Sequence, residues 1–157
     1  MKNKKGFTLI ELLVVVAIMG LLAALAVVAL NTARARARDA RRVSDIKQIQ
    51  TALELYYMDN YKYPADPENN LIEDLCLSSG GDFAVHPCSG TTYMGTVPEN
   101  PRPRTDGACD DTVYTYNAED VGSGSDLSYY IIYCLGSATG DIAAGTHYGT
   151  PAGIADP

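Results

Sequence analysis

Hydrophobic and polar residues divide the chain into two parts with different patterns. The stretch from Phe7 to Leu30 is apolar at almost every position, and only Thr8, Glu11 and Gly20 interrupt it. At 1.5 Å per residue, such a stretch would form a helix of about 36 Å, long enough to cross the hydrocarbon core of a bilayer. The pattern therefore predicts a transmembrane helix near the N-terminus.

After Asn31 the helical pattern continues in amphipathic form. Apolar residues recur at steps of three and four and form one helix face: Ala33, Ala40, Val43, Ile46, Ile49, Leu53 and Tyr56. The other side carries Arg38, Arg41, Arg42, Asp45 and Gln48. Pro64 disfavours helical geometry at Tyr63. We therefore expect one helix over residues 7–60, whose second part packs on the head of its own subunit.

Residues 61–157 contain short elements between turns and are expected to form a small globular head. The segment Leu71–Leu77 is interpreted as one or two helical turns. Strands are predicted at Thr92–Val97, Val113–Asn117 and Leu127–Leu135. Pro98, Pro101, Pro103 and Gly122–Gly124 indicate loops. The expected fold class is α+β, with a long N-terminal α-helix and a small antiparallel sheet packed on its end.

Charge is distributed unevenly along the chain. Residues 1–50 hold nine basic and three acidic residues, whereas residues 51–157 hold three basic and sixteen acidic ones, which gives the net charge of −7. Arg34–Arg42 has no interleaved aromatic residues for base stacking, so we predict no nucleic-acid role. A solvated helix face, or contact with lipid headgroups or with acidic patches of neighbouring subunits, remains open for these arginines.

All four cysteines lie in the acidic part of the chain. An even number in a small module rich in Gly and Pro favours disulfides and an oxidising compartment outside the cytoplasm. A metal site is the alternative, but there is no Cys-x-x-Cys pair and the two histidines do not have finger-like spacings. Three pairings are possible, and closeness in sequence favours Cys76–Cys88 and Cys109–Cys134.

Glu11 is the most informative residue of the apolar stretch. An acid in a membrane helix costs about 2.5–3.5 kcal/mol on insertion scales, so it needs a functional reason. A secretory signal peptide has its small-residue cleavage site after the apolar region, whereas Gly6 precedes this one. If the chain were cut after Gly6, the new amine of Phe7 would be a cation that Glu11 of a neighbouring subunit could pair with.

The string Lys5-Gly6-Phe7-Thr8-Leu9-Ile10-Glu11-Leu12 resembles the class III signal of type IV prepilins and type II secretion pseudopilins. Asp59-Asn60-Tyr61-Lys62-Tyr63-Pro64 is similar to a junction common in pseudopilins of the major type and in related pilins. The resemblance covers about sixty residues, from Lys5 to Pro64.

The resemblance implies processing and assembly. A membrane prepilin peptidase would remove residues 1–6 by cutting between Gly6 and Phe7 and would methylate the new amine, and Glu11 would act in assembly. The implied partners are copies of the same chain, an inner-membrane platform protein and a cytoplasmic ATPase. Major pseudopilins bind calcium after a segment similar to Leu135-Gly136-Ser137; here Asp141 is the nearest acid behind it, and plain solvated acidic loops are the favoured interpretation.

The sequence thus predicts a structural protein and not an enzyme, because no catalytic motif is present. The main hypothesis is a subunit of a type IV pilus-like filament, polymerised through its N-terminal helix. The alternative is a major-type pseudopilin of a type II secretion system, and a lone membrane-anchored binding domain is a third possibility. We expect the chain in the inner membrane with its head outside, and then in an extracellular filament or a periplasmic pseudopilus.

Overall fold

The structure is a computed structural model that describes residues 6–110, 112–120 and 126–155. Residues 1–5 of the expected leader 1–6 and the loop expected at Gly122–Gly124 lie outside the described residues. The chain divides into two compact units, Met1–Arg34 and Ala35–Pro157. We call the second of these the head unit; it contains the sheets together with the second half of the long helix.

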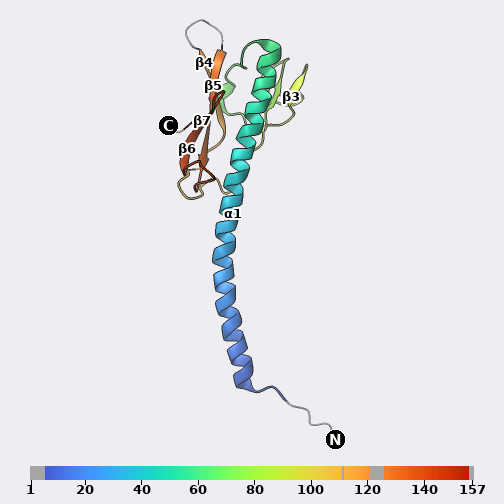
Figure 1. Cartoon of the computed structure of the whole chain (residues 1–157). Coiled ribbons are helices and arrows are strands. Elements are labelled where there is room, and N and C mark those ends of the chain that lie inside the picture. Colours follow the sequence, from blue (N-terminus) through green and yellow to red (C-terminus); the bar gives the residue numbers. More distant parts are fainter. Residues whose placement is uncertain (1–5, 111, 121–125, 156–157) are drawn as a thin grey trace. The chain divides into compact units, whose positions relative to one another are not determined.

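One helix, α1, runs from Leu9 to Asn60 and confirms the long N-terminal helix (Figure 1). No proline occurs within it. It ends where Tyr61 adopts a left-handed backbone conformation with φ of 57°, and the Tyr61 amide donates to the Tyr57 carbonyl at 2.8 Å. A left-handed residue directly after the last helical one is a common way to end a helix, and Pro64 follows three residues later.

The head unit contains two antiparallel sheets, which confirms the α+β class. The first has the strand order β2-β1-β3 and the second is a meander in the order β4-β5-β6-β7. A short 3₁₀ helix precedes them at Glu68–Asn70. The strands are β1 (Cys76–Ser78), β2 (Asp82–Ala84), β3 (Thr92–Met94), β4 (Thr115–Asp120), β5 (Asp126–Leu135), β6 (Gly145–Thr150) and β7 (Gly153–Ala155).

Sequence patterns located β3, β4 and β5 and missed the other strands. The strand expected at 127–135 is β5, and those expected at 92–97 and 113–117 overlap β3 and β4. The helical turns expected at 71–77 were wrong, because this segment leads into β1. Strands β2, β6 and β7 were not predicted. They are short or rich in Gly and Ala, and their place depends on pairing with neighbouring strands.

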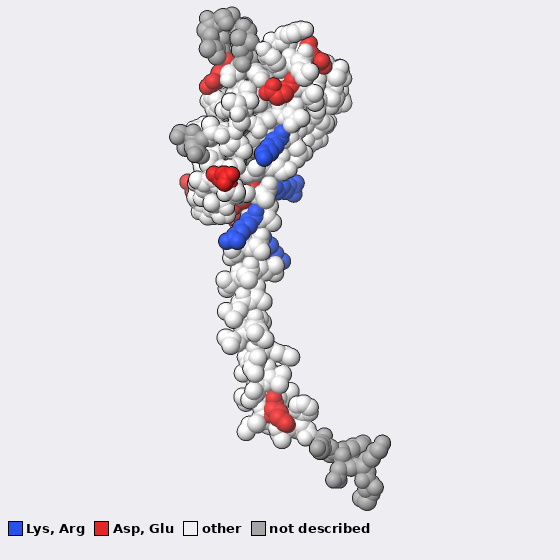
Figure 2. All heavy atoms as spheres, viewed as in Figure 1, with Lys and Arg blue, Asp and Glu red and all other residues white. Residues whose placement is uncertain are grey.

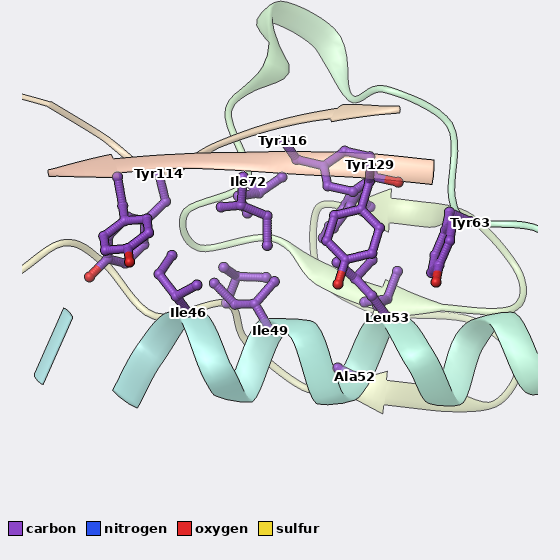
Figure 3. Packing of buried hydrophobic residues seen from close by; sticks show 14 of the residues in the cluster. Ile46, Ile49, Ala52, Leu53, Tyr63, Ile72, Tyr114, Tyr116 and Tyr129 are labelled. Carbon is purple, nitrogen blue, oxygen red and sulfur yellow. The ribbon is translucent and has the colours of Figure 1, made fainter. Parts of the chain in front are cut away.

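The hydrophobic core lies between α1 and the sheets (Figure 3). The helix contributes Ile46, Ile49 and Leu53, each fully buried. Alternate residues of β5 face them, because side chains along a strand alternate between its two faces; these are Tyr129, Ile131, Tyr133 and Leu135. The prediction that the helix face from Val43 to Tyr56 packs on the head is therefore confirmed.

Three charged residues of α1 are buried along with this apolar face. Asp39, Arg42 and Asp45 each have less than 5% of their surface exposed. The pattern had placed Arg42 and Asp45 on the solvent side of the helix, which is wrong. Ala33 and Ala40, expected on the packed face, are exposed. The polar contacts described next explain why charged side chains replace apolar ones in this part of the helix.

Candidate processing and assembly site

The predicted cleavage junction lies just before α1. Gly6, Phe7 and Thr8 have no regular secondary structure, and the Phe7 side chain is 84% exposed. A peptidase needs an accessible and locally unwound backbone, because regular secondary structure engages the scissile amide. The geometry at Gly6–Phe7 is compatible with cleavage there, which stays a prediction.

Glu11 takes part in a capping box at the start of α1. The Thr8 amide and hydroxyl donate to Oε2 of Glu11 at 2.8 and 2.7 Å, and the Glu11 amide donates to the Thr8 hydroxyl at 3.2 Å. This reciprocal pattern satisfies backbone donors that a helix start otherwise leaves unpaired. Both of these bonds end on Oε2, so among the described residues Oε1 of Glu11 is left for a further donor. The Thr-x-x-Glu spacing is the sequence signal for this cap, which the sequence analysis missed.

The first half of α1 presents apolar side chains to its surroundings on all sides. An 18-residue window of this helix has a mean hydropathy of 3.1 and none of it is buried. By length and composition, α1 is the one helix among the described residues that could cross a membrane. Figure 2 shows this part as an almost uncharged surface. Such a surface must be covered by lipid or by protein.

The arginines of α1 divide into two groups. Arg34, Arg36 and Arg41 are exposed, and Arg41 makes only a long contact of 3.8 Å with Asp45. Arg38 and Arg42 point into the head unit and form ion pairs with its acidic residues. In Figure 2, the basic side chains visible on this face gather along the middle of α1. Only the exposed group is available for lipid headgroups or neighbouring subunits.

Arg42 is completely buried and is surrounded by acceptors. Its guanidinium donates to Asp39 at 2.6 Å, to Asn100 at 2.8 Å and to Asp106 at 3.2 Å. It also donates to the backbone carbonyls of Pro101 and Pro103 at 3.1 and 3.0 Å. A buried cation is tolerated only when it is paired and hydrogen-bonded. Arg42 therefore fixes the loop of residues 100–106 to α1.

Asp106 is the second anchor of the same loop. Arg38 donates to both of its carboxylate oxygens, at 2.6 and 2.7 Å. The hydrogen bonds from Arg38, together with the charges of Arg38 and Arg42, hold the pKa of the Asp106 carboxyl below its ordinary value. Burial acts in the opposite direction on Asp45, and raises its pKa.

Two disulfides lie in the head unit. Cys76 pairs with Cys88 and Cys109 pairs with Cys134, the pairing that closeness in sequence favoured. Among the described residues, one group of three potential metal ligands lies within 4.8 Å, namely Cys76, His86 and Cys88. The sulfur atoms of Cys76 and Cys88 are bonded to each other in a disulfide, so this group does not offer two thiolates to a metal ion. The second disulfide ties the loop after Asp106 to the end of β5.

The expected calcium residue lies in an open turn. Asp141 is exposed, next to a small β-bridge between Thr139 and Ile142. Within the described part of the chain, it belongs to no group of three acidic or other metal-ligating side chains. Calcium takes six to eight oxygen ligands, usually with several carboxylates, so the residues described here do not fit a calcium ion.

The histidines and tyrosines have mainly structural places. His86 is exposed, whereas His147 is only 2% exposed. Pairing of Tyr133 with His147 between β5 and β6 brings the imidazole inside, where Nε2 lies 2.9 Å from the Ala143 carbonyl oxygen. Tyr56 and Tyr63 are buried at the end of α1, whereas Tyr61 is 80% exposed.

Comparison with known proteins agrees with the geometry at the N-terminus. Residues 1–27 match the model of the prokaryotic N-terminal methylation motif. The type II secretion system core protein G of Pseudomonas aeruginosa is 32% identical over 133 residues, which cover 80% of this chain and 91% of that protein. The chain belongs to the type II secretion system core protein G family.

Other members of the core protein G family show the same relationship. The protein of Klebsiella michiganensis is 43% identical over 100 residues, which cover 64% of this chain and 69% of that relative. The protein of Escherichia coli K12 is 43% identical over 62 residues, or 40% of this chain and 43% of that relative. No solved structure matches. Membership of this pseudopilin family supports the secretion alternative better than the pilus hypothesis.

Proposed function

We propose that this chain is the major-type pseudopilin of a type II secretion system. It would be a structural subunit, polymerised through its N-terminal helix into a short pseudopilus. The observation that carries the proposal is the 32% identity to a core protein G over 91% of that protein's length. The unburied apolar half of α1 supports it, because this surface needs lipid before assembly and neighbouring helices afterwards.

The proposal assigns roles to three residues at the N-terminus. A prepilin peptidase would cut between Gly6 and Phe7 and methylate the new amine of Phe7, in keeping with the methylation motif. Glu11 of one subunit would then pair with the Phe7 amine of the next. The carboxylate already bonds Thr8 through Oε2, so its other oxygen is the acceptor that we assign to the neighbouring amine.

The subunit would begin in the inner membrane, with its head in the periplasm. An assembly platform in the membrane and a cytoplasmic ATPase would then extract it into the pseudopilus. A charge pair at one membrane depth would offset the desolvation of both groups and fix the axial stagger between subunits. Exposed Arg34, Arg36 and Arg41 are placed to contact lipid headgroups before extraction.

Mass spectrometry of cell fractions tests this role. A peptide that begins at methylated Phe7 should occur in the membrane fraction and be absent from filaments sheared off the cell surface. Abundant Phe7 peptide in the sheared filaments would instead establish a surface pilus. A retained Met1–Gly6 leader would contradict both kinds of filament.

Substitutions of Glu11 test the proposed pairing. Glu11→Gln keeps an oxygen that can accept from Thr8 but removes the charge, and Glu11→Leu removes both. Both variants should still insert and be cleaved, yet assemble poorly, as measured by the yield of cross-linked multimers. Leu12→Ile is the matched control and should assemble normally. A normal yield of multimers from Glu11→Gln would contradict the proposed charge pair but would not change the assignment to the family.

A further inference from the structure

The turn after β5 is held by a carboxylate of α1. Asp39 accepts hydrogen bonds from the Gly136 amide at 2.9 Å, from the Ser137 amide at 3.0 Å and from the Ser137 hydroxyl at 2.7 Å. We call this arrangement the Asp39 clasp. It joins residues almost a hundred positions apart in sequence, and Asp39 is only 1% exposed.

The polarity of the clasp is opposite to that of a cation site. A calcium ion is held by oxygen atoms that point at it, whereas Gly136 and Ser137 direct N–H and O–H donors toward an anion. The Ser137 carbonyl oxygen, another potential ligand, accepts from the Thr139 hydroxyl at 3.2 Å. The resemblance to major pseudopilins implies calcium in this segment, whereas the backbone amides and the hydroxyl of this turn are arranged to bind a negative charge.

The negative charge of Asp39 is balanced by an arginine of the same helix. Arg42 lies 2.6 Å from Asp39 and is fully buried. It contacts Asp106 as well, and the backbone beside Asp106 packs on the same turn, where the Ala108 amide donates to the Gly136 carbonyl at 3.3 Å. The cluster of Asp39, Arg42 and Asp106 thus connects the turn after β5 both to α1 and to the loop that contains Asp106. A metal ion connects the segments that bind it in the same way.

We propose that the Asp39 carboxylate and the Arg42 guanidinium replace a bound calcium ion in fixing the turn after β5. The head unit therefore keeps its fold, and this turn stays ordered, without calcium. The inference concerns contacts within one subunit. It therefore stands or falls independently of whether the chain assembles into a pseudopilus.

Hydrogen–deuterium exchange of the full chain in detergent tests the proposal, since exchange reports local opening. Peptides over residues 136–142 should exchange equally fast in millimolar CaCl₂ and in excess EGTA. Ser137→Ala removes one of the three bonds from this turn to Asp39 and should speed exchange of the turn about tenfold in both solutions. Ala138→Ser, a change of similar size at the exposed neighbouring position, is the matched control and should leave the rate nearly unchanged.

Two results would overturn the proposal. Slower exchange of the wild-type turn in calcium would show that the turn binds the cation after all. Equal rates for Ser137→Ala and Ala138→Ser would show that the clasp does not hold the turn. Asp39→Asn adds a stronger variant: it should open the turn further, and calcium should not restore it.

Discussion

At the scale of single residues, Arg42 is a fully buried cation that joins α1 to a distant loop of the head unit. It donates to two carboxylates, a side-chain amide and two backbone carbonyls. A buried pair adds little stability over a well-packed apolar residue, but removal of one partner leaves the other charge uncompensated. The cluster therefore matters most for the specificity of the fold.

Replacement of Arg42 should be strongly destabilising. Arg42→Met removes the cation and leaves the buried Asp39 carboxylate without this counter-charge, at a cost of about 3–5 kcal/mol in the free energy of unfolding. Arg36→Met alters an exposed arginine of the same helix and should change stability by less than about 0.5 kcal/mol. Urea unfolding in detergent, followed by the near-ultraviolet circular dichroism of the tyrosines, measures both. Equal stability of the two variants would refute the role of Arg42.

Two glycines with the same backbone geometry should respond differently to a methyl group. Gly107 and Gly140 both have positive φ, of 56° and 63°. Alanine at Gly140 meets no atom within 4 Å and should cost only the strain of a left-handed residue, about 1–2 kcal/mol. Alanine at Gly107 would also overlap the Gly136 carbonyl, so its cost should be roughly twice as large or more.

The same unfolding assay decides between these expectations for the glycines. A Gly107→Ala variant as stable as Gly140→Ala would mean that the loop of residues 100–110 can move away from the turn after β5. Such movement would also weaken the argument that the two segments are held together.

At the scale of elements, α1 is one helix with two different surroundings. Its first half is apolar on all sides, while its second half has a packed face that begins with the charged residues 39, 42 and 45 and continues with Ile46, Ile49 and Leu53. Within the head unit, the second half of α1 thus contacts the loops by ion pairs near Asp39 and the sheets by hydrophobic packing nearer its end. Along α1, the change from ion pairs to hydrophobic contacts occurs within about one helical turn.

The second disulfide should stabilise the elements that the Arg42 cluster joins. Cys109–Cys134 closes a loop with a sequence separation of 25 residues, and a cross-link of this size contributes about 3 kcal/mol in the chain-entropy model. The double variant Cys109→Ser/Cys134→Ser should lose about that much stability. The comparison protein is Cys76→Ser/Cys88→Ser, whose shorter loop predicts a slightly smaller loss. A negligible loss for the 109–134 pair would show that the ion cluster alone holds the loop.

At the scale of the whole molecule, acidic residues outnumber basic ones, so the free energy of unfolding is expected to depend on pH. The pKa of Asp106 is lowered, mainly by its bonds to Arg38. A lowered folded pKa adds stability that is present above the ordinary carboxyl pKa and is lost as the pH falls through the folded value. Asp45 acts in the opposite sense, because burial raises its pKa and its protonation at low pH relieves that cost.

Removal of the partner of Asp106 should therefore change the pH dependence of stability. Arg38→Met should be less stable than wild type near pH 7, and the difference should shrink as the pH falls below about 4, where Asp106 becomes protonated in the unfolded chain. Free energies of unfolding at a series of pH values measure the difference. A gap that stays constant down to pH about 3 would mean that Arg38 acts by packing and not by charge.

Features that depend on local pattern could be predicted from the amino-acid sequence. The long apolar run predicted the first half of α1, Pro64 predicted its end, and alternating large side chains predicted β5. The string around Gly6, Phe7 and Glu11 resembles the prepilin signal, and the position of an acid within an apolar helix indicated that Glu11 needs a partner.

Which charged residues are buried depends on how the folded chain packs, and local pattern does not reveal it. Arg41 and Arg42 are neighbours in sequence, yet Arg41 is exposed and Arg42 fully buried. Periodicity placed both on the solvent side, since it weighs hydrophobicity and cannot see that Asn100, Asp106 and two carbonyls converge on one of them. Asp39 and Ser137 are likewise in contact although they lie 98 positions apart in the sequence. Partners so far apart in sequence meet only once the sheets have packed on α1, so only the folded chain reveals them.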